Sequence, residues 1–136
     1  MKRFRYKSIK RIRELEEKLA EEAFLEAIHR LRQLANDSKR YSQLYKTYRE
    51  QFTRGEISWE EMINLIKRID TIRKMLQEAY NIVEEKRRAL TDANIKLKMM
   101  EKLEDKWKEE VFQEEMRVLA EILDDFGSYK TFIKSQ

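Results

Sequence analysis

The chain has 136 residues, of which 41% are charged and 41% hydrophobic, with two glycines, no proline and no cysteine. Sheet-containing domains need glycine, proline or asparagine at their turns, so this composition excludes most β and α/β folds and favours long helices. The absence of cysteine excludes disulfides and thiolate metal or redox sites. No uncharged run exceeds five residues, so neither a secretion signal nor a membrane-spanning helix is expected.

The first predicted helix covers about residues 5–52 and begins with a strongly basic segment. Residues 1–13 hold seven basic side chains and no acidic one. Positive charge is unfavourable at a helix N-terminus, where the helix dipole is already positive. Either acidic residues of a second helix compensate this charge, or an acidic partner surface does. The acidic candidates within the chain are Glu101, Glu104, Asp105, Glu109 and Glu110.

Apolar residues at alternating steps of three and four predict that this helix takes part in a coiled coil. The expected contact positions are Ile9, Ile12, Glu16, Leu19 and Ala23, followed by Leu34, Ser38, Tyr41, Tyr45, Tyr48 and Phe52. Between the two runs, Ala23, Ala27 and Leu31 are spaced by four residues twice. Such a stutter locally unwinds a supercoil.

A short turn is predicted at residues 53–58. Gly55 can adopt the left-handed conformation that closes a helix, and Ser58 with Glu61 has the spacing of a capping box that opens the next one. A connection of this length makes the two helices antiparallel. The sequence therefore predicts one all-α domain over residues 1–136, folded as a helical hairpin.

The second predicted helix covers about residues 59–126, and Gly127 is expected to end it before a short tail at 127–136. Its coiled-coil seam is regular, with Lys86 as a polar interruption. The seam consists of Met62, Leu65, Ile69, Ile72, Leu76, Ala79, Val83, Lys86, Leu90, Ala93, Leu97 and Met100. Leu44, Ile66 and Tyr80 flank the seams and either broaden them or form a lateral docking patch.

Because the second helix is longer, its end, about residues 109–126, is expected to project beyond the first helix. Two apolar rows lie side by side on this overhang, which is wider than a two-stranded seam requires. The rows are Val111, Val118 and Ile122, and Phe112, Met116, Leu119, Leu123 and Phe126. Large exposed apolar surfaces usually mark a contact with another chain.

Catalysis is not expected from this sequence. The single histidine, His29, lies between the predicted seam positions Ala27 and Leu31, and no glycine-rich loop is present to bind phosphate. The carboxylates lack a histidine at metal-ligand spacing and are typical of a solvated helical face. We therefore predict no enzymatic activity, no cofactor and no metal. A net charge of +4 without a basic, aromatic stripe also argues against nucleic acid as the partner.

Several stretches, taken in order, resemble the FliJ family of flagellar type III export proteins. Near the start these are Phe4-Arg5-Tyr6-Lys7, residues 12–17 and Ala20. The stronger likeness is in the C-terminal half, in Arg87-Arg88-Ala89-Leu90-Thr91-Asp92-Ala93, in Met100-Glu101-Lys102-Leu103-Glu104-Asp105-Lys106 and in Leu119-Ala120-Glu121-Ile122-Leu123-Asp124-Asp125-Phe126. Together they span nearly the whole chain.

This resemblance implies a cytoplasmic stalk, peripheral to the inner membrane at the flagellar base, which inserts into the flagellar export ATPase hexamer and promotes its assembly and activity. It also implies contacts with the export gate protein FlhA and with export chaperones, and a chain that is monomeric when free. The implied ATPase-ring contacts are Arg3, Phe4, Arg5, Lys7, Arg11, Phe112, Met116, Leu119, Leu123 and Phe126. The implied export-gate contacts are Tyr41, Leu44, Tyr48, Leu65, Arg68 and Ile72.

Three other functions fit parts of the sequence. The stalk of a virulence-type secretion injectisome would share the hairpin and the size. A generic coiled-coil scaffold or dimerisation module would show a sustained seam without an exposed apolar end. A nucleic-acid-binding hairpin would bind DNA or RNA with a steep dependence on salt.

Overall fold

The computed structural model describes the backbone of residues 3–135 and the side chains of residues 3–128. It contains two helices, α1 (Lys7–Thr53) and α2 (Trp59–Ser135), and no strand among the described residues. The predicted all-α hairpin is thus confirmed. The chain divides into two compact units. The hairpin unit is Glu16–Asn94, and the terminal unit is Met1–Leu15 with Ile95–Gln136. Within the described residues, no helix is both long and apolar enough to cross a membrane.

The turn between the helices forms through local backbone chemistry. Gly55 has a φ of +74°, and its N–H donates to the Phe52 carbonyl at 3.0 Å, while the Glu56 N–H donates to the Gln51 carbonyl at 2.8 Å. This pair of bonds is the Schellman motif, which satisfies carbonyls at a helix C-terminus. On the other side of the turn, the Ser58 hydroxyl accepts a hydrogen bond from the Glu61 N–H at 3.2 Å.

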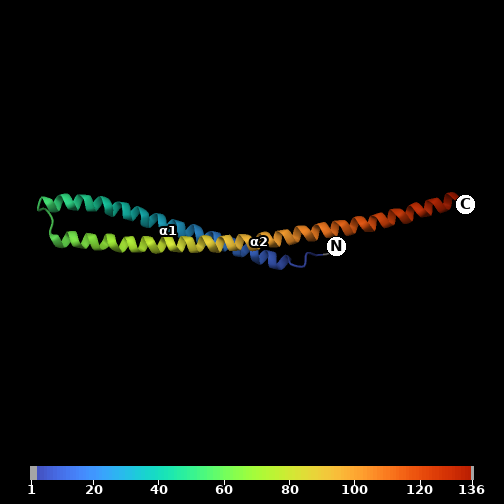
Figure 1. The fold of residues 1–136 in the computed structure, drawn as a ribbon, viewed down its shortest axis with the longest axis horizontal. Helices are drawn as coiled ribbons and strands as arrows, with labels where there is room; N and C mark the ends of the chain where they lie inside the picture. The colour runs from blue at the N-terminus through green and yellow to red at the C-terminus, as the bar shows by residue number, and fades with distance from the viewer. Residues whose placement is uncertain (1–2, 136) are drawn as a thin grey trace. The chain divides into compact units, whose positions relative to one another are not determined.

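In the hairpin unit the C-terminal part of α1 lies antiparallel to the N-terminal part of α2 (Figure 1). The rings of Phe52 and Trp59 meet across the turn with centroids 5.6 Å apart. Every predicted α2 seam position within this unit is buried or half-buried, including Lys86. The buried members are Met62, Leu65, Ala79, Val83 and Ala93.

The α1 seam follows the predicted course from Leu34 to Tyr48, but Phe52 is 40% exposed and the course before Leu34 differs from the predicted one. Residues spaced by alternating threes and fours are buried or half-buried without a break. In the hairpin unit these are Glu17, Ala20, Phe24, Ala27, Leu31, Leu34, Ser38, Tyr41, Tyr45 and Tyr48. Ala23, Ala27 and Leu31, where a stutter was predicted, are also buried or half-buried. Leu19, which was expected to lie in the seam, is 56% exposed. The heptad that contains Ala20, Phe24 and Ala27 places Leu19 outside the contact face.

In the terminal unit, α2 continues the same spacing through Leu97, Met100, Glu104, Trp107 and Val111, all of which are buried or half-buried. The first turns of α1 contribute Lys10 and Arg13, also half-buried, whereas Ile12 is 54% exposed. The predicted seam through Ile9 and Ile12 is therefore wrong, because charged residues occupy the contact positions there.

Beyond Val111, the described part of α2 has the character predicted for an overhang. Every residue from 112 to 128 is exposed. The helix does not end near Phe126 as predicted but continues through Gly127 to Ser135. Gly127 lacks the positive φ that closes α1 at Gly55, and a glycine in a helical conformation is tolerated within a helix at a modest cost.

Candidate binding surfaces

The described residues offer surfaces rather than an enclosed reaction site. No group of histidine, aspartate and glutamate side chains among them has the arrangement of a metal site. No polar or charged residue among them is classed as buried. The candidate sites described here are surfaces formed by exposed side chains of the two helices.

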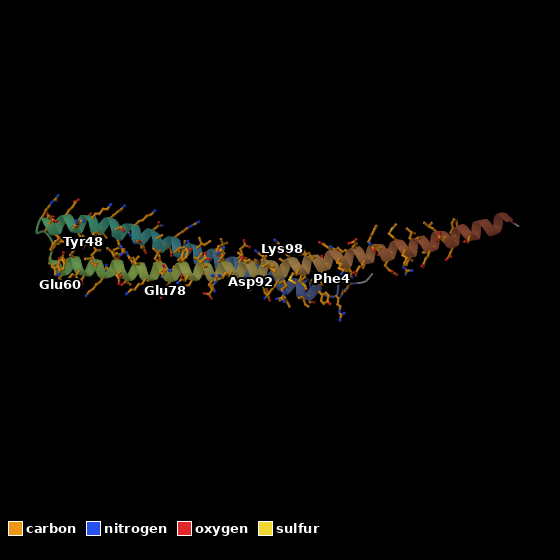
Figure 2. All side chains as sticks on the ribbon, viewed as in Figure 1. Phe4, Tyr48, Glu60, Glu78, Asp92 and Lys98 are labelled. Atoms are coloured by element: carbon orange, nitrogen blue, oxygen red, sulfur yellow. The ribbon has the colours of Figure 1, made fainter. Side chains whose placement is uncertain are left out.

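An aromatic contact fixes the start of the chain to α2 in the terminal unit. The Phe4 ring lies 5.6 Å from the Trp107 ring and 5.9 Å from the Tyr6 ring, measured between centroids. Phe4 is only 8% exposed. Figure 2 labels Phe4 at the start of the chain. Its burial gives it a structural role, which separates it from the other residues implied as ring contacts. Trp107 was not identified as a contact residue from the sequence, although the α2 seam spacing continues from Met100 through Glu104 to Trp107.

An ion pair next to this contact joins α1 to α2. The Lys10 ammonium lies 3.1 Å from a Glu104 carboxylate oxygen, and Lys108 approaches the same oxygen at 3.2 Å. The hydrogen bond from Lys10, followed by that from Lys108, lowers the pKa of Glu104 below its ordinary value. The same hydrogen bond to Glu104 raises the pKa of Lys10. Glu104, one of the acidic residues expected to compensate the basic segment, thus pairs with a cation of that segment.

The remaining basic residues implied as ring contacts face the solvent. Arg3, Arg5, Lys7 and Arg11 are all exposed, and the Arg5 guanidinium lies 5.8 Å from the centroid of the Tyr6 ring. Four cations thus remain at the surface beside the aromatic contact. Such a cluster favours an acidic partner.

The overhang carries two chemically distinct faces. Five of the residues implied as ring contacts, Phe112, Met116, Leu119, Leu123 and Phe126, are between 46% and 60% exposed. At about 100° per residue they fall on one side of the helix, together with Val118 and Ile122. Arg117 lies on the opposite side and pairs with Glu114 and Glu121 at 2.7 Å each. The apolar residues therefore form a broad face that Glu115 interrupts, whereas Arg117 and its two partners are directed away from it.

The residues implied as export-gate contacts do not form one surface. Leu65 is buried, Tyr41, Tyr48 and Ile72 are half-buried in the seam, and Leu44 and Arg68 are exposed. Three of them, Tyr48, Leu65 and Arg68, line a shallow groove of about 450 Å³ together with Glu61 and Asn64. The other three residues do not line this groove.

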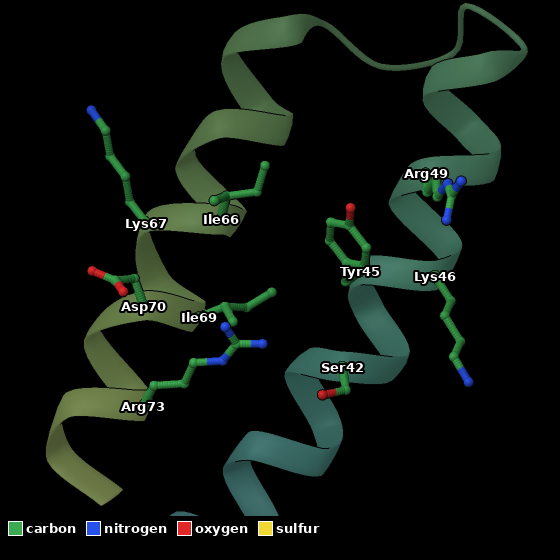
Figure 3. A pocket seen from close by; sticks show the side chains of 9 residues that line it. All are labelled: Ser42, Tyr45, Lys46, Arg49, Ile66, Lys67, Ile69, Asp70 and Arg73. Carbon is green, nitrogen blue, oxygen red and sulfur yellow. The ribbon is translucent and has the colours of Figure 1, made fainter. Parts of the chain in front are cut away.

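A larger groove lies on a different side of the same seam and was not anticipated from the sequence. From α1 it is lined by Ser42, Tyr45, Lys46 and Arg49. From α2 it is lined by Ile66, Lys67, Ile69, Asp70 and Arg73, and its volume is about 720 Å³ (Figure 3). The sequence contains an indication of this groove, because Lys46 and Arg49 follow Tyr45, and Lys67 and Arg73 lie on either side of Ile69. Recognising that indication required the register between the helices.

Comparisons with known protein families, with curated proteins and with solved structures found no match to this chain.

Proposed function

We propose that this chain is a non-catalytic stalk of the flagellar type III export apparatus that inserts its terminal unit into the ring of the export ATPase. The observation that carries the proposal is the exposed apolar face of the overhang, formed by Phe112, Met116, Leu119 and Leu123. The resemblance to the FliJ family, stated above from the sequence, supplies the identity of the proposed partner.

An exposed apolar face of this width is typical of a surface that a partner protein buries. A large apolar side chain contributes roughly 1.5–3 kcal/mol when it passes from full exposure to full burial. These four side chains are 46–60% exposed, so burying each of them contributes about half of that. The helix that carries the face is held at its base by the contact of Phe4 with Trp107. The proposed partner therefore meets a positioned surface, which lowers the entropic cost of binding.

The cations at Arg3, Arg5, Lys7 and Arg11 complete the proposed contact. Exposed charges of one sign steer association and fix orientation more than they add affinity. Ile12 and Leu15 are also exposed on α1 in this unit, at 54% and 57%. Neither residue was among the implied ring contacts, and we add both to the proposed contact.

In this proposal the hairpin unit carries the secondary contacts. Tyr48, Leu65 and Arg68, which share the smaller groove, are the candidates for the export gate protein FlhA. Handling of export chaperones and a cytoplasmic location at the flagellar base belong to the same proposal. The stalk of a virulence-type injectisome remains the alternative, and the genes that neighbour this one in the genome distinguish the two systems.

The test is the ATPase turnover and the oligomeric state of the cognate export ATPase, measured with and without an equimolar amount of this protein. The proposal predicts faster turnover and more hexamer. A double substitution, Leu119→Asp with Leu123→Asp, places two carboxylates on the apolar face and should abolish the effect while the chain remains helical.

The matched control is Gln113→Asp with Ala120→Asp, which adds two carboxylates to the same exposed helix on its polar side. This variant should stimulate the ATPase like the original chain. Equal loss of stimulation in both variants would mean that added negative charge, rather than the apolar face, is responsible. Full stimulation by the Leu119 and Leu123 variant would remove the overhang from the proposed contact.

A dimerisation module is the competing function that the same apolar face could serve, through a second copy of this chain. Sedimentation equilibrium over a range of concentrations separates the two. The proposal predicts a 16.7 kDa monomer. A stable dimer that dissociates in the Leu119→Asp, Leu123→Asp variant would instead assign the face to self-association.

A further inference from the structure

The larger groove of the hairpin unit combines an apolar floor with a basic rim. Tyr45 projects from α1 toward α2, and Ile66 and Ile69 project from α2 toward α1 (Figure 3). Ile66 is 43% exposed, although it lies beside the seam. The space of about 720 Å³ between these side chains is within the range that accommodates large ligand groups.

Four cations surround this floor, and only one carboxylate lies among them. Lys46 and Arg49 come from α1, Lys67 and Arg73 come from α2, and the carboxylate is Asp70. Asp70 is engaged by Lys74, which lies outside the groove, at 3.2 Å. None of the four cations forms an ion pair with another residue whose side chain the structure describes. The side chains that line the groove therefore carry a net charge of +3.

We propose that this groove binds an acidic helical segment of a partner protein that inserts a large apolar side chain between Tyr45 and Ile66. The apolar floor supplies a place for the side chain, and the cations on both helices supply partners for carboxylates on either side of it. The groove lies on a different side of the seam from Tyr48, Leu65 and Arg68, so it is distinct from the proposed gate contact.

Charge and shape together favour a peptide over nucleic acid. A nucleic-acid site needs a basic track along the backbone path, with aromatic faces open for stacking. Here the basic residues flank an apolar groove, and Tyr45 is half-buried in the seam. The inference does not depend on the export ATPase, which is proposed to meet the terminal unit.

The experiment measures binding of fluorescein-labelled helical peptides to the full chain by fluorescence anisotropy. The probe carries glutamates around one phenylalanine and one leucine spaced four residues apart. Two matched peptides replace the glutamates by glutamine, or the phenylalanine and leucine by alanine. We expect the probe to bind and both matched peptides to bind at least about tenfold more weakly, a difference of 1.4 kcal/mol.

Two charge-reversal variants locate the site. Arg49→Glu with Arg73→Glu should weaken binding of the probe about tenfold or more, because it reverses one rim charge on each helix. Arg32→Glu with Arg88→Glu makes the same change in net charge at exposed positions of α1 and α2 that do not line the groove. This control should bind the probe almost unchanged. Ile66→Ala should reduce affinity roughly fivefold through lost apolar contact.

Circular dichroism confirms that each variant is helical before binding is compared. Amide chemical shifts that move on titration should cluster at residues 42–49 and 66–73. Failure of the probe to bind, or equal weakening by the two charge-reversal pairs, overturns the proposal. So does a single-stranded oligonucleotide that displaces the probe at lower concentration than the unlabelled peptide, because the groove would then be a polyanion site.

Discussion

Gly55 and Gly127 occupy backbone positions of opposite kinds. Gly55 has a φ of +74°, the left-handed conformation that L-amino acids avoid, whereas Gly127 lies within α2 without a positive φ. A methyl group added at either position would meet no neighbouring atom within 4 Å. Substitution by alanine therefore tests backbone conformation alone at both sites.

We predict that Gly55→Ala lowers the free energy of unfolding by about 1 kcal/mol, because alanine must adopt the left-handed conformation in the turn. Gly127→Ala should instead favour helix formation near the end of α2 by up to about 1 kcal/mol. Thermal denaturation followed by circular dichroism measures the first effect, and helical signal at low temperature measures the second. Destabilisation by both substitutions would contradict this assignment of the two glycines.

Lys10 and Glu104 make the stability of the terminal unit dependent on pH. The pKa of Glu104 is lowered in the folded chain, so its contribution is present above the ordinary pKa and is lost as pH falls through the lowered one. The pKa of Lys10 is raised, so its contribution is present below the ordinary pKa and is lost as pH rises through the raised one. Both contributions are present between about pH 5 and about pH 10.

We predict that Trp107 fluorescence reports release of the N-terminal segment on both sides of this window, measured in a Trp59→Phe background that leaves one tryptophan. Glu104→Gln should flatten both transitions, since it removes the charged partner of Lys10. The control is Glu14→Gln, because Glu14 lies 3.9 Å from Lys10 on the same helix. This variant should preserve both transitions. Unchanged titration in Glu104→Gln would show that the pair does not hold the segment.

At the scale of the helices, Lys86 is half-buried at a seam position that is otherwise occupied by apolar residues. A leucine there would add apolar surface to the contact between α1 and α2. We predict that Lys86→Leu raises the free energy of unfolding by about 1 kcal/mol. The control Lys39→Leu makes the same substitution at an exposed position of α1 and should have little effect. A fall in stability at Lys86 would imply that its ammonium group makes a necessary interaction.

The helices differ in how well their contact faces could be predicted. In α2 every seam position from Met62 to Met100 except Lys86 is apolar, so periodicity alone identified it. In α1 the seam passes through Glu17, Ala20 and Ala27, while Leu19 is exposed. Hydrophobicity alone assigned the larger side chains of α1 to the contact face. An uninterrupted heptad predicts that face better, because small and charged residues can occupy contact positions when the partner helix is close.

At the scale of the whole molecule, the exposed overhang could be predicted because the arms are unequal, and its apolar face is indeed exposed. The burial of Phe4 against Trp107 and the basic groove around Ile66 could not be predicted from the sequence. Both depend on which residues of two distant segments lie opposite each other. Periodicity within one helix fixes a face but not the register of its partner.

The distribution of charge predicts how salt affects the proposed complex with the export ATPase. Replacing Arg3, Arg5, Lys7 and Arg11 by glutamine should weaken binding more at low salt than at high salt, because exposed charges are screened over about 10 Å at 0.1 M. Replacing Arg32 and Arg88 by glutamine should have a smaller effect at either salt concentration. A loss of binding that is independent of salt would indicate misfolding rather than lost electrostatic attraction.

The most direct test of the central proposal is photo-crosslinking from single positions of the overhang. A photoreactive phenylalanine analogue is placed at Leu119 or Leu123 on the apolar face, or at Gln113 on the polar face, and the chain is mixed with the cognate export ATPase. We predict crosslinks to ATPase subunits from positions 119 and 123 and few from position 113. Equal crosslinking from both faces, or none from the apolar face, would contradict insertion of the overhang into the ring.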